Sequence, residues 1–120
     1  MEEHWAIDSM PPSLNETTNA AEQPDYLLQP AAGDARCRFV TFGPHNSFPM
    51  HVTETLDFLV VLSGELRLIM EEGDIVLRPG DSVVQRGTLH AWANDSDEEC
   101  VVVGVLISSL AGPEQPAVAV

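Results

Sequence analysis

The sequence predicts an all-β fold, a double-sheet jelly-roll β-barrel that follows an irregular N-terminal arm. Short apolar and β-branched segments fill residues 34–110, and glycine, proline, asparagine and aspartate interrupt them every few residues. This is the pattern of short antiparallel strands joined by tight turns. No segment shows the apolar period of a helix, and closure into a double-sheet barrel leaves few exposed strand edges.

The barrel region divides, in order, into about nine strands. Residues 36–42 alternate polar and apolar side chains, as a half-buried strand does. Residues 65–71 alternate in the same way, and the Glu-Gly-Asp sequence that follows them is a favoured hairpin turn. Residues 56–62 and 100–108 are continuously apolar. Shorter predicted strands include residues 50–53, 75–77, 82–85 and 90–93.

The two ends of the chain differ from this barrel, which we assign to residues 34–110. Residues 1–33 are punctuated by proline, asparagine and glycine, which predicts an arm that crosses the surface of the domain or of a partner subunit. We expect residues 111–120 to be a flexible C-terminal tail. Apolar side chains of the arm are expected to dock part of it: Trp5, Ile7, Met10, Leu14, Leu27 and Leu28.

Composition excludes several classes of partner. A chain of 120 residues forms one domain, and its net charge of −14 includes only five Lys and Arg. Binding of nucleic acid or of an anionic membrane surface requires clustered cations, so neither partner is expected. The sequence has no apolar run of membrane-spanning length and no secretory signal. Cys37 and Cys100 are too few for a disulfide framework, so we expect reduced thiols and a cytoplasmic protein.

Two motifs in the central part of the chain resemble those of the cupin family. The first cupin motif contains a His-x-His pair, a glutamate and a closing glycine; His51 matches its first histidine, Asp57 stands in the place of the glutamate, and Gly64 matches the glycine. The residues that match the second motif are Gly80, Gly87, His90 and Asn94. The resemblance covers residues 40–107 and implies the cupin jelly roll, a fold that supports many chemistries.

The sequence departs from the cupin motifs at three places. Thr53 stands where the second histidine belongs, Asp57 is one methylene shorter than glutamate, and Arg86 replaces a proline in a second motif that is one residue short. The residue pattern of both motifs is similar to that of small single-domain cupins from bacteria and fungi, which are often found among natural-product biosynthesis genes. This similarity implies a small-molecule-processing enzyme of secondary metabolism.

Three functions are open for the predicted site, in which His51, Asp57 and His90 face the barrel interior. Two imidazoles and a carboxylate suit a facial site for Fe, Mn, Ni or Zn, and would support oxygenase, lyase or isomerase chemistry. The same residues without a metal suit general acid/base catalysis by a dehydratase, isomerase or cyclase. In the third interpretation the barrel only binds a small molecule and the histidines are satisfied core residues.

Further residues are candidates for contact with a small organic substrate. Thr53 is a poor metal ligand but offers a hydroxyl to a bound water or a substrate oxygen. Trp92 shares a strand face with His90 and is expected to form a wall of the pocket. Arg86 is a candidate clamp for a carboxylate. Phe39 and Met50 are candidate apolar contacts. We expect a homodimer that forms through the arm and an edge strand.

Overall fold

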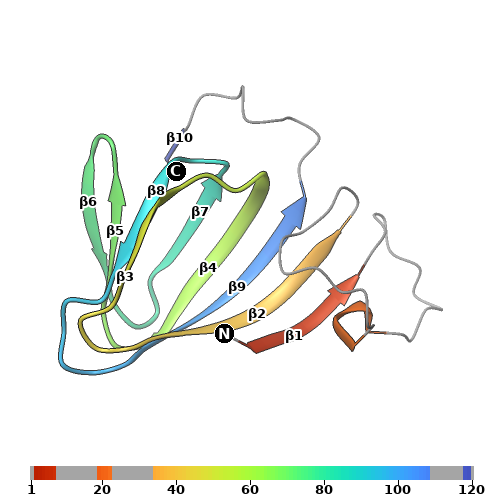
Figure 1. Cartoon of the computed structure of the whole chain (residues 1–120), viewed down its shortest axis with the longest axis horizontal. Coiled ribbons are helices and arrows are strands. Elements are labelled where there is room, and N and C mark those ends of the chain that lie inside the picture. The colour runs from red at the N-terminus through yellow and green to blue at the C-terminus, as the bar shows by residue number, and fades with distance from the viewer. Residues whose placement is uncertain (1, 8–18, 23–33, 109–117, 120) are drawn as a thin grey trace.

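Two antiparallel sheets make up the structure, a computed structural model that describes residues 2–7, 19–22, 34–108 and 118–119 (Figure 1). In spatial order, the larger sheet contains β1 (Glu2–Ile7), β2 (Ala35–Phe42), β9 (Cys100–Ser108), β4 (Thr55–Ser63), β7 (Ser82–Arg86) and β10 (Val118–Ala119). The smaller sheet contains β3 (Ser47–His51), β8 (His90–Ala93), β5 (Leu66–Met70) and β6 (Gly73–Leu77).

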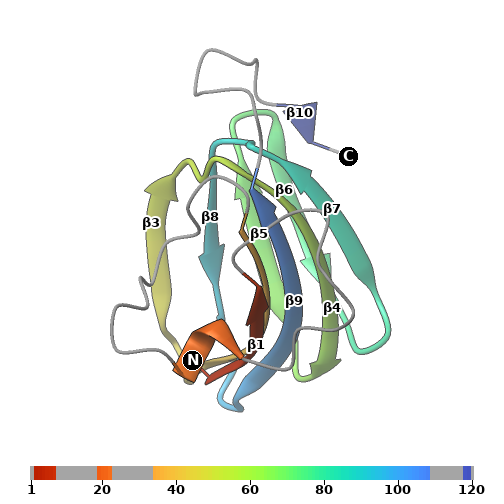
Figure 2. The same ribbon diagram turned by 90° about the vertical axis from the view of Figure 1, so that its right-hand side faces the viewer.

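The hydrophobic core lies between the two sheets. The β3 and β4 strands lie on opposite sides of the interior in both ribbon views (Figures 1 and 2). Because side chains alternate along each strand, every second residue of both sheets points into this interior. The buried apolar cluster comes from both sheets and comprises Phe42, Val61, Leu66, Leu68, Leu77, Val83, Trp92, Cys100 and Val102. This architecture confirms the predicted jelly-roll barrel.

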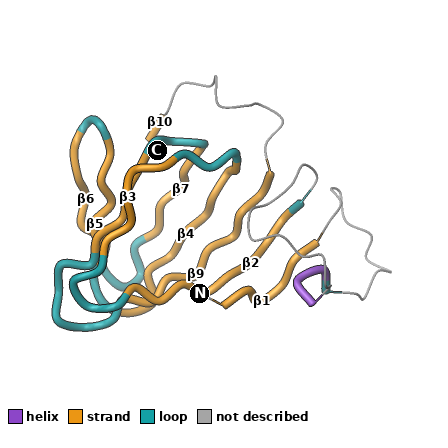
Figure 3. The backbone as a smooth tube through the Cα atoms, in the orientation of Figure 1, coloured by secondary structure: helices purple, strands orange, loops and turns teal. Residues whose placement is uncertain are grey.

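The predicted strands match the observed ones closely, with one correction. We expected a strand over residues 50–53, whereas β3 starts at Ser47 and ends at His51. The residues after His51 carry the chain from the four-stranded sheet to the six-stranded sheet, a connection that Figure 3 draws as a loop. His51 and Asp57 therefore approach the interior from opposite sheets rather than from one continuous strand face.

The described parts of the N-terminal region dock on the barrel. Strand β1 pairs antiparallel with β2 and extends the larger sheet by one strand. Asn19 holds this strand, because its Oδ1 accepts hydrogen bonds from the backbone N–H groups of Ala6 and Ala21, each at 3.0 Å. The segment that contains Trp5 and Ile7 is docked through its backbone pairing with β2, whereas the Trp5 side chain stays 43% exposed. The expected docking at Met10, Leu14, Leu27 and Leu28, and the tail as far as residue 117, lie outside the described residues.

Helical structure is minimal in the described part of the chain, where η1 (Ala20–Glu22) is a single 3-10 turn. Among these same residues, no helix is long and apolar enough to cross a lipid bilayer. Both cysteines are free thiols. Cys100 is buried, and burial raises the pKa of its thiol.

Candidate functional site

A cavity of about 350 Å³ opens between the inner faces of the two sheets. Its size lies at the lower end of the range for small-molecule pockets. One part of the wall is apolar, and its side chains are Val40, Phe42, Phe48, Leu59, Leu66, Trp92, Val102 and Leu106. The polar side chains of the wall are Arg38, His51, Thr53, Asp57 and His90. The cavity therefore has the apolar body and the few polar groups that are typical of a ligand site.

His51 and His90 form the central pair of this site. They are direct cross-strand partners on β3 and β8, so the backbone itself brings their side chains together. The ring centroids lie 4.4 Å apart and the ring planes are inclined by 56°. His90 also makes an edge contact with Trp92, two residues along the same strand, with 5.5 Å between ring centroids. The tryptophan ring thus limits where the His90 ring can turn.

Hydrogen bonds to the backbone set the tautomer of both rings. His51 Nδ1 lies 2.8 Å from the carbonyl oxygen of Pro49, and His90 Nδ1 lies 2.5 Å from that of Thr88. A carbonyl oxygen only accepts, so in each ring Nδ1 carries the hydrogen and the neutral form has its lone pair on Nε2. Burial lowers the pKa of His90, and the nearby His51 lowers it further. His90 is therefore a neutral imidazole with a basic Nε2 at neutral pH.

Asp57 is the buried carboxyl group of the cavity. Burial raises its pKa, and hydrogen bonding by Thr55 and the charge of Arg38 partly oppose this rise. The Thr55 hydroxyl donates to Asp57 Oδ1 at 2.5 Å and lies 3.2 Å from Thr53 Oγ1. Two threonine hydroxyls thus connect Asp57 to the loop between the sheets, and the carboxyl group exchanges a proton more readily near neutral pH than an exposed one does.

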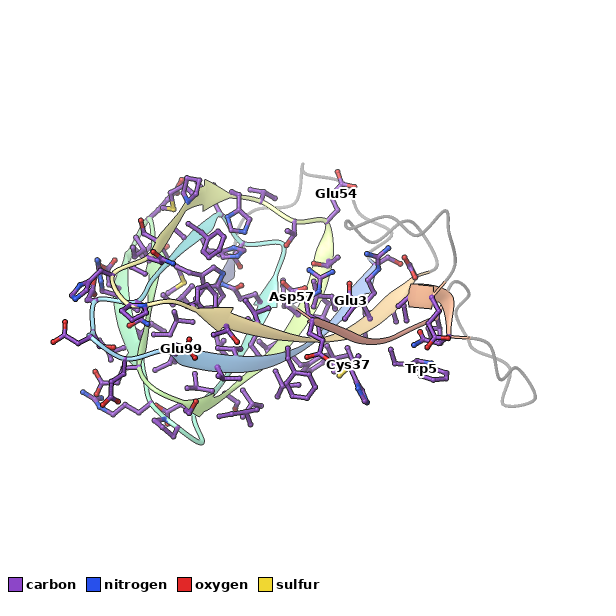
Figure 4. All side chains as sticks on the ribbon, turned by 60° about the horizontal axis from the view of Figure 1, so that its bottom comes forward. Glu3, Trp5, Cys37, Glu54, Asp57 and Glu99 are labelled. Atoms are coloured by element: carbon purple, nitrogen blue, oxygen red, sulfur yellow. The ribbon has the colours of Figure 1, made fainter. Side chains whose placement is uncertain are left out.

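Arg38 places a positive charge in the same wall. It forms a two-pronged ion pair with Glu3 of β1, in which Nε and Nη2 lie 2.7 and 2.8 Å from the two carboxylate oxygens. Figure 4 shows Glu3 and Asp57 on one side of the larger sheet, opposite Trp5 and Cys37. The N-terminal strand therefore supplies the acid that orients a cavity arginine, a role that the sequence did not suggest.

The predicted metal triad is not assembled as a three-ligand cluster. Within residues 2–7, 19–22, 34–108 and 118–119, no three His, Cys, Asp or Glu side chains come close enough together to hold one metal ion. The two Nε2 lone pairs suit two positions on a transition metal, but catalytic sites ordinarily take about three protein ligands. Thr53 stands in the place of a third imidazole and Asp57 bonds to Thr55 instead. The donor set as arranged does not fit a three-ligand site.

The structure brings five of the predicted site residues to the cavity: His51, Thr53, Asp57, His90 and Trp92. The other three lie elsewhere, which corrects those assignments. Arg86 is exposed and lies opposite Leu56, on the face of the sheet that points away from the interior. Phe39 alternates with the inward-pointing Arg38 and points outward for that reason. Met50 is 43% exposed on the edge strand β3.

Some polar residues of the interior were not among the predicted site residues, and Arg38 and Gln85 are two of them. Arg38 could have been found from the alternation of residues 36–42, once the inward face was known. Gln85 is the other; it is 1% exposed, and neither amide atom has a hydrogen-bond partner among the described residues. It lies directly opposite Asp57 across β4 and β7, so the two side chains share the inner face. A lone glutamine in a strand gives no signal of such burial.

Comparison with known proteins agrees with this geometry. Residues 38–107 match the family described as the cupin domain. A fungal relative, Phomopsin biosynthesis cluster protein C' of Diaporthe leptostromiformis, is 34% identical over 97 residues, which cover 77% of this chain and 51% of that protein. The cupin-domain-containing oxidoreductase virC of Hypocrea virens is 41% identical over 59 residues, or 48% of this chain and 30% of that protein. The chain thus spans about half the length of the first relative and a smaller share of the second.

Solved structures show the same fold. A cupin 2 conserved barrel domain protein from Salinispora arenicola superposes with a TM-score of 0.58 at 18% identity, over 62% of this chain and 64% of that chain. The salicylate 1,2-dioxygenase of Pseudaminobacter salicylatoxidans gives a TM-score of 0.56 at 22% identity, over 60% of this chain and 21% of that chain. Fold and site define a small double-sheet barrel with paired imidazoles in an apolar cavity. The chain belongs to the cupin family.

Proposed function

We propose that this chain is the catalytic barrel of an enzyme that processes a small molecule in secondary metabolism. The observation that carries this proposal is the His51–His90 pair, whose rings meet at a cavity wall with both Nε2 atoms as lone-pair donors. The names of two relatives add support, since one is a biosynthesis cluster protein and the other a cupin-domain-containing oxidoreductase.

The chemistry that this arrangement supports best is proton transfer next to a carbonyl group. His90, neutral because burial lowers its pKa, is the general base that takes a proton from the carbon beside the carbonyl. Arg38 supplies positive charge for the enolate oxygen that develops. The carboxyl group of Asp57, whose pKa burial raises, returns a proton. Reprotonation at another carbon gives an isomer; protonation of a β-hydroxyl group expels water and gives the unsaturated product.

The cavity selects a substrate with an apolar body and one oxygen-bearing end. The apolar wall includes Phe42, Phe48 and Trp92, which suit an aromatic ring or an unsaturated chain. The polar groups gather near the histidine pair and suit a carbonyl, hydroxyl or carboxylate group. An aromatic acid or a polyketide-like intermediate has both features, and we propose this substrate class.

Proton abstraction can be tested before the natural substrate is known. Small aromatic ketones and β-hydroxy ketones are incubated with the protein in D₂O, and loss of the α-proton signal is followed by NMR. We expect wild-type protein to accelerate exchange for some members of this panel, and His90→Gln to lower the rate by about a hundredfold, as removal of a general base does. Binding of ligands without exchange by the wild-type protein would contradict proton abstraction and leave the metal-centred and binding functions.

Metal-centred chemistry is the second candidate, and the observation that favours it is the pair of neighbouring imidazoles, each with its lone pair on Nε2. His51 and His90 would be the protein ligands, and a bound metal would act as a Lewis acid or in redox chemistry at the cavity. Elemental analysis of protein purified without a histidine tag, before and after chelation, separates the candidates. Proton exchange that survives a chelator supports acid/base catalysis. Stoichiometric metal that both His51→Ala and His90→Ala lose, together with activity that the chelator removes, supports the metal.

A further inference from the structure

Among the residues that the structure describes, none covers the outer face of the six-stranded sheet, and this face is apolar. Its central row runs across five neighbouring strands in direct register and consists of Trp5, Cys37, Val105, Phe58 and Val84. Phe39, Val103 and Val60 form the adjacent row. We call these eight residues the sheet face. Figure 4 shows two of them, Trp5 and Cys37, on the side of the sheet away from Asp57.

Water reaches a large part of this surface in the single chain. Trp5 and Phe58 are 43% and 44% exposed, and Leu62, which follows on the same strand, is 48% exposed. Strand alternation and register place only two charged residues on the outer side of these five strands within the described residues. These are Glu2 and Arg86, and both lie at its margins. Contiguous exposed apolar surface on this scale marks an interaction site.

The outer face of the smaller sheet is different and provides a natural control. There Arg67 forms ion pairs with Asp74 at 2.7 Å and with Asp95 at 2.8 Å. Val76 lies opposite Arg67 on this face and is 42% exposed, close to the 38% of Val105 on the sheet face. The two sheets thus present one solvated, charged face and one apolar face.

We infer that a second copy of this chain packs on the sheet face. The five strands are five to nine residues long. At about 4.8 Å between strands and about 3.3 Å per residue, they offer on the order of 600 Å². This approaches the roughly 800 Å² per partner of a standard interface. Two such sheets can pack face to face across a two-fold axis, as in a β-sandwich.

Charge also favours a second copy on this face. The chain carries a net charge of −14, so two copies repel each other wherever their acidic surfaces meet. The sheet face has no acidic side chain, and it therefore lets two copies approach without burying a carboxylate. The sequence suggested a dimer through the arm and an edge strand. Strand β1 instead pairs within its own chain, so we assign the contact to the face and not to the edge.

Matched variants on the two faces test this interface by sedimentation velocity from 1 to 100 µM. Wild-type protein should sediment as a dimer at the upper concentrations. Val105→Glu should be monomeric at all of these concentrations, because its dimer dissociation constant should rise at least a hundredfold. Val76→Glu should behave as wild type. The milder pair, Val105→Thr and Val76→Thr, keeps β-branched side chains, so any loss of dimer in Val105→Thr is free of a folding defect. We expect about tenfold weakening in Val105→Thr and none in Val76→Thr.

Two outcomes would overturn the inference. Wild-type protein that remains monomeric at 100 µM would leave the face to another partner or to a further segment of a longer polypeptide. A dimer that Val105→Thr and Val105→Glu leave intact, in variants that circular dichroism shows to be folded, would place the contact elsewhere. Neither outcome depends on the proposed chemistry, because the sheet face and the cavity lie on opposite sides of the sheet.

Discussion

At the scale of single residues, the interior of this barrel combines two groups whose pKa values move in opposite directions. Burial lowers the pKa of His90 and raises the pKa of Asp57. Both shifts favour the neutral forms, so the cavity holds a neutral base and a carboxyl group inclined to keep its proton. General acid/base catalysis needs such a pair, an imidazole that is free to accept a proton and a carboxyl group that keeps one to donate.

Asp57→Asn should stabilise the protein, and more so at higher pH. A raised folded-state pKa means that the folded protein holds a proton that the unfolded chain loses above the ordinary value of 3.8. The free energy of unfolding of the wild-type protein therefore falls as pH rises from 3.8 to the folded-state pKa. The asparagine side chain does not titrate, so the variant does not show this fall. Urea unfolding between pH 4 and pH 8 should show a growing advantage of the variant over wild type.

The same series on His90→Gln provides the control, with the opposite sign. The pKa of His90 is lowered from 6.5, so the unfolded chain takes up a proton first as pH falls. Wild-type stability is lost below that value, and the glutamine variant should gain relative to wild type at low pH. A stability difference for Asp57→Asn that does not change with pH would mean that Asp57 is charged and well compensated in the folded state.

Gln85→Met should raise the free energy of unfolding by about 1–2 kcal/mol. The side chain is buried and its amide nitrogen and oxygen are both without a partner among the described residues, so replacement by an apolar side chain of similar length removes a desolvation cost. For a domain of this size the melting temperature should rise by several degrees. Gln85→Glu, which puts a second carboxylate beside Asp57, should destabilise. A lower melting temperature for Gln85→Met would show that the amide binds water or a ligand.

At the scale of strands and turns, local pattern predicted most of the architecture. The alternation of residues 65–71 predicted β5 (Leu66–Met70), and the apolar run of residues 100–108 predicted β9 with its observed bounds. Pattern could not show where the chain changes sheets, because the residues after His51 are as β-branched as a strand. Arg86 was misplaced because the predicted strand ended at residue 85, whereas β7 includes Arg86 and its side chain shares the outward face with Leu56. Pairing of β1 with β2 depends on long-range register, which no local window contains.

Gly64→Ala should cost far more stability than Gly80→Ala, although both glycines have positive φ angles, of 77° and 88°. A side chain at either position lowers the free energy of unfolding by roughly 1–2 kcal/mol, because this backbone conformation is unfavourable for residues other than glycine. A Cβ atom on Gly64 would also overlap the carbonyl oxygen of Glu99 and lie 2.8 Å from Cα of Cys100, whereas nothing lies within 4 Å of one on Gly80. We expect a loss of about 3 kcal/mol or more at Gly64 and about half of that or less at Gly80.

Urea unfolding at a fixed protein concentration measures both variants, since dimerisation would otherwise shift the apparent stability. Equal losses at the two positions would mean that the β4–β5 turn can move away from the start of β9. The expected inequality would explain the motif glycine at residue 64 as a position of close backbone approach, in addition to a turn.

At the scale of the whole molecule, acidity and apolarity are segregated. The net charge of −14 is carried elsewhere, while the sheet face is uncharged across five strands. The cavity opens to the other side of that sheet, so association on the sheet face would leave the His51–His90 pair accessible. A dimer of this kind covers apolar surface without blocking the site.

Dimer affinity should therefore increase with salt at moderate ionic strength. Two chains of charge −14 repel over about 30 Å at 0.01 M salt and over only about 8 Å at 0.15 M, while apolar contact is little affected in this range. We expect the dissociation constant to fall about tenfold between these concentrations, measured by sedimentation equilibrium at pH 7.5. Val76→Glu, which adds one negative charge outside the interface, should steepen this dependence slightly. An affinity that decreases with salt would mean that opposite charges hold the two chains together, and it would contradict an interface on the uncharged sheet face.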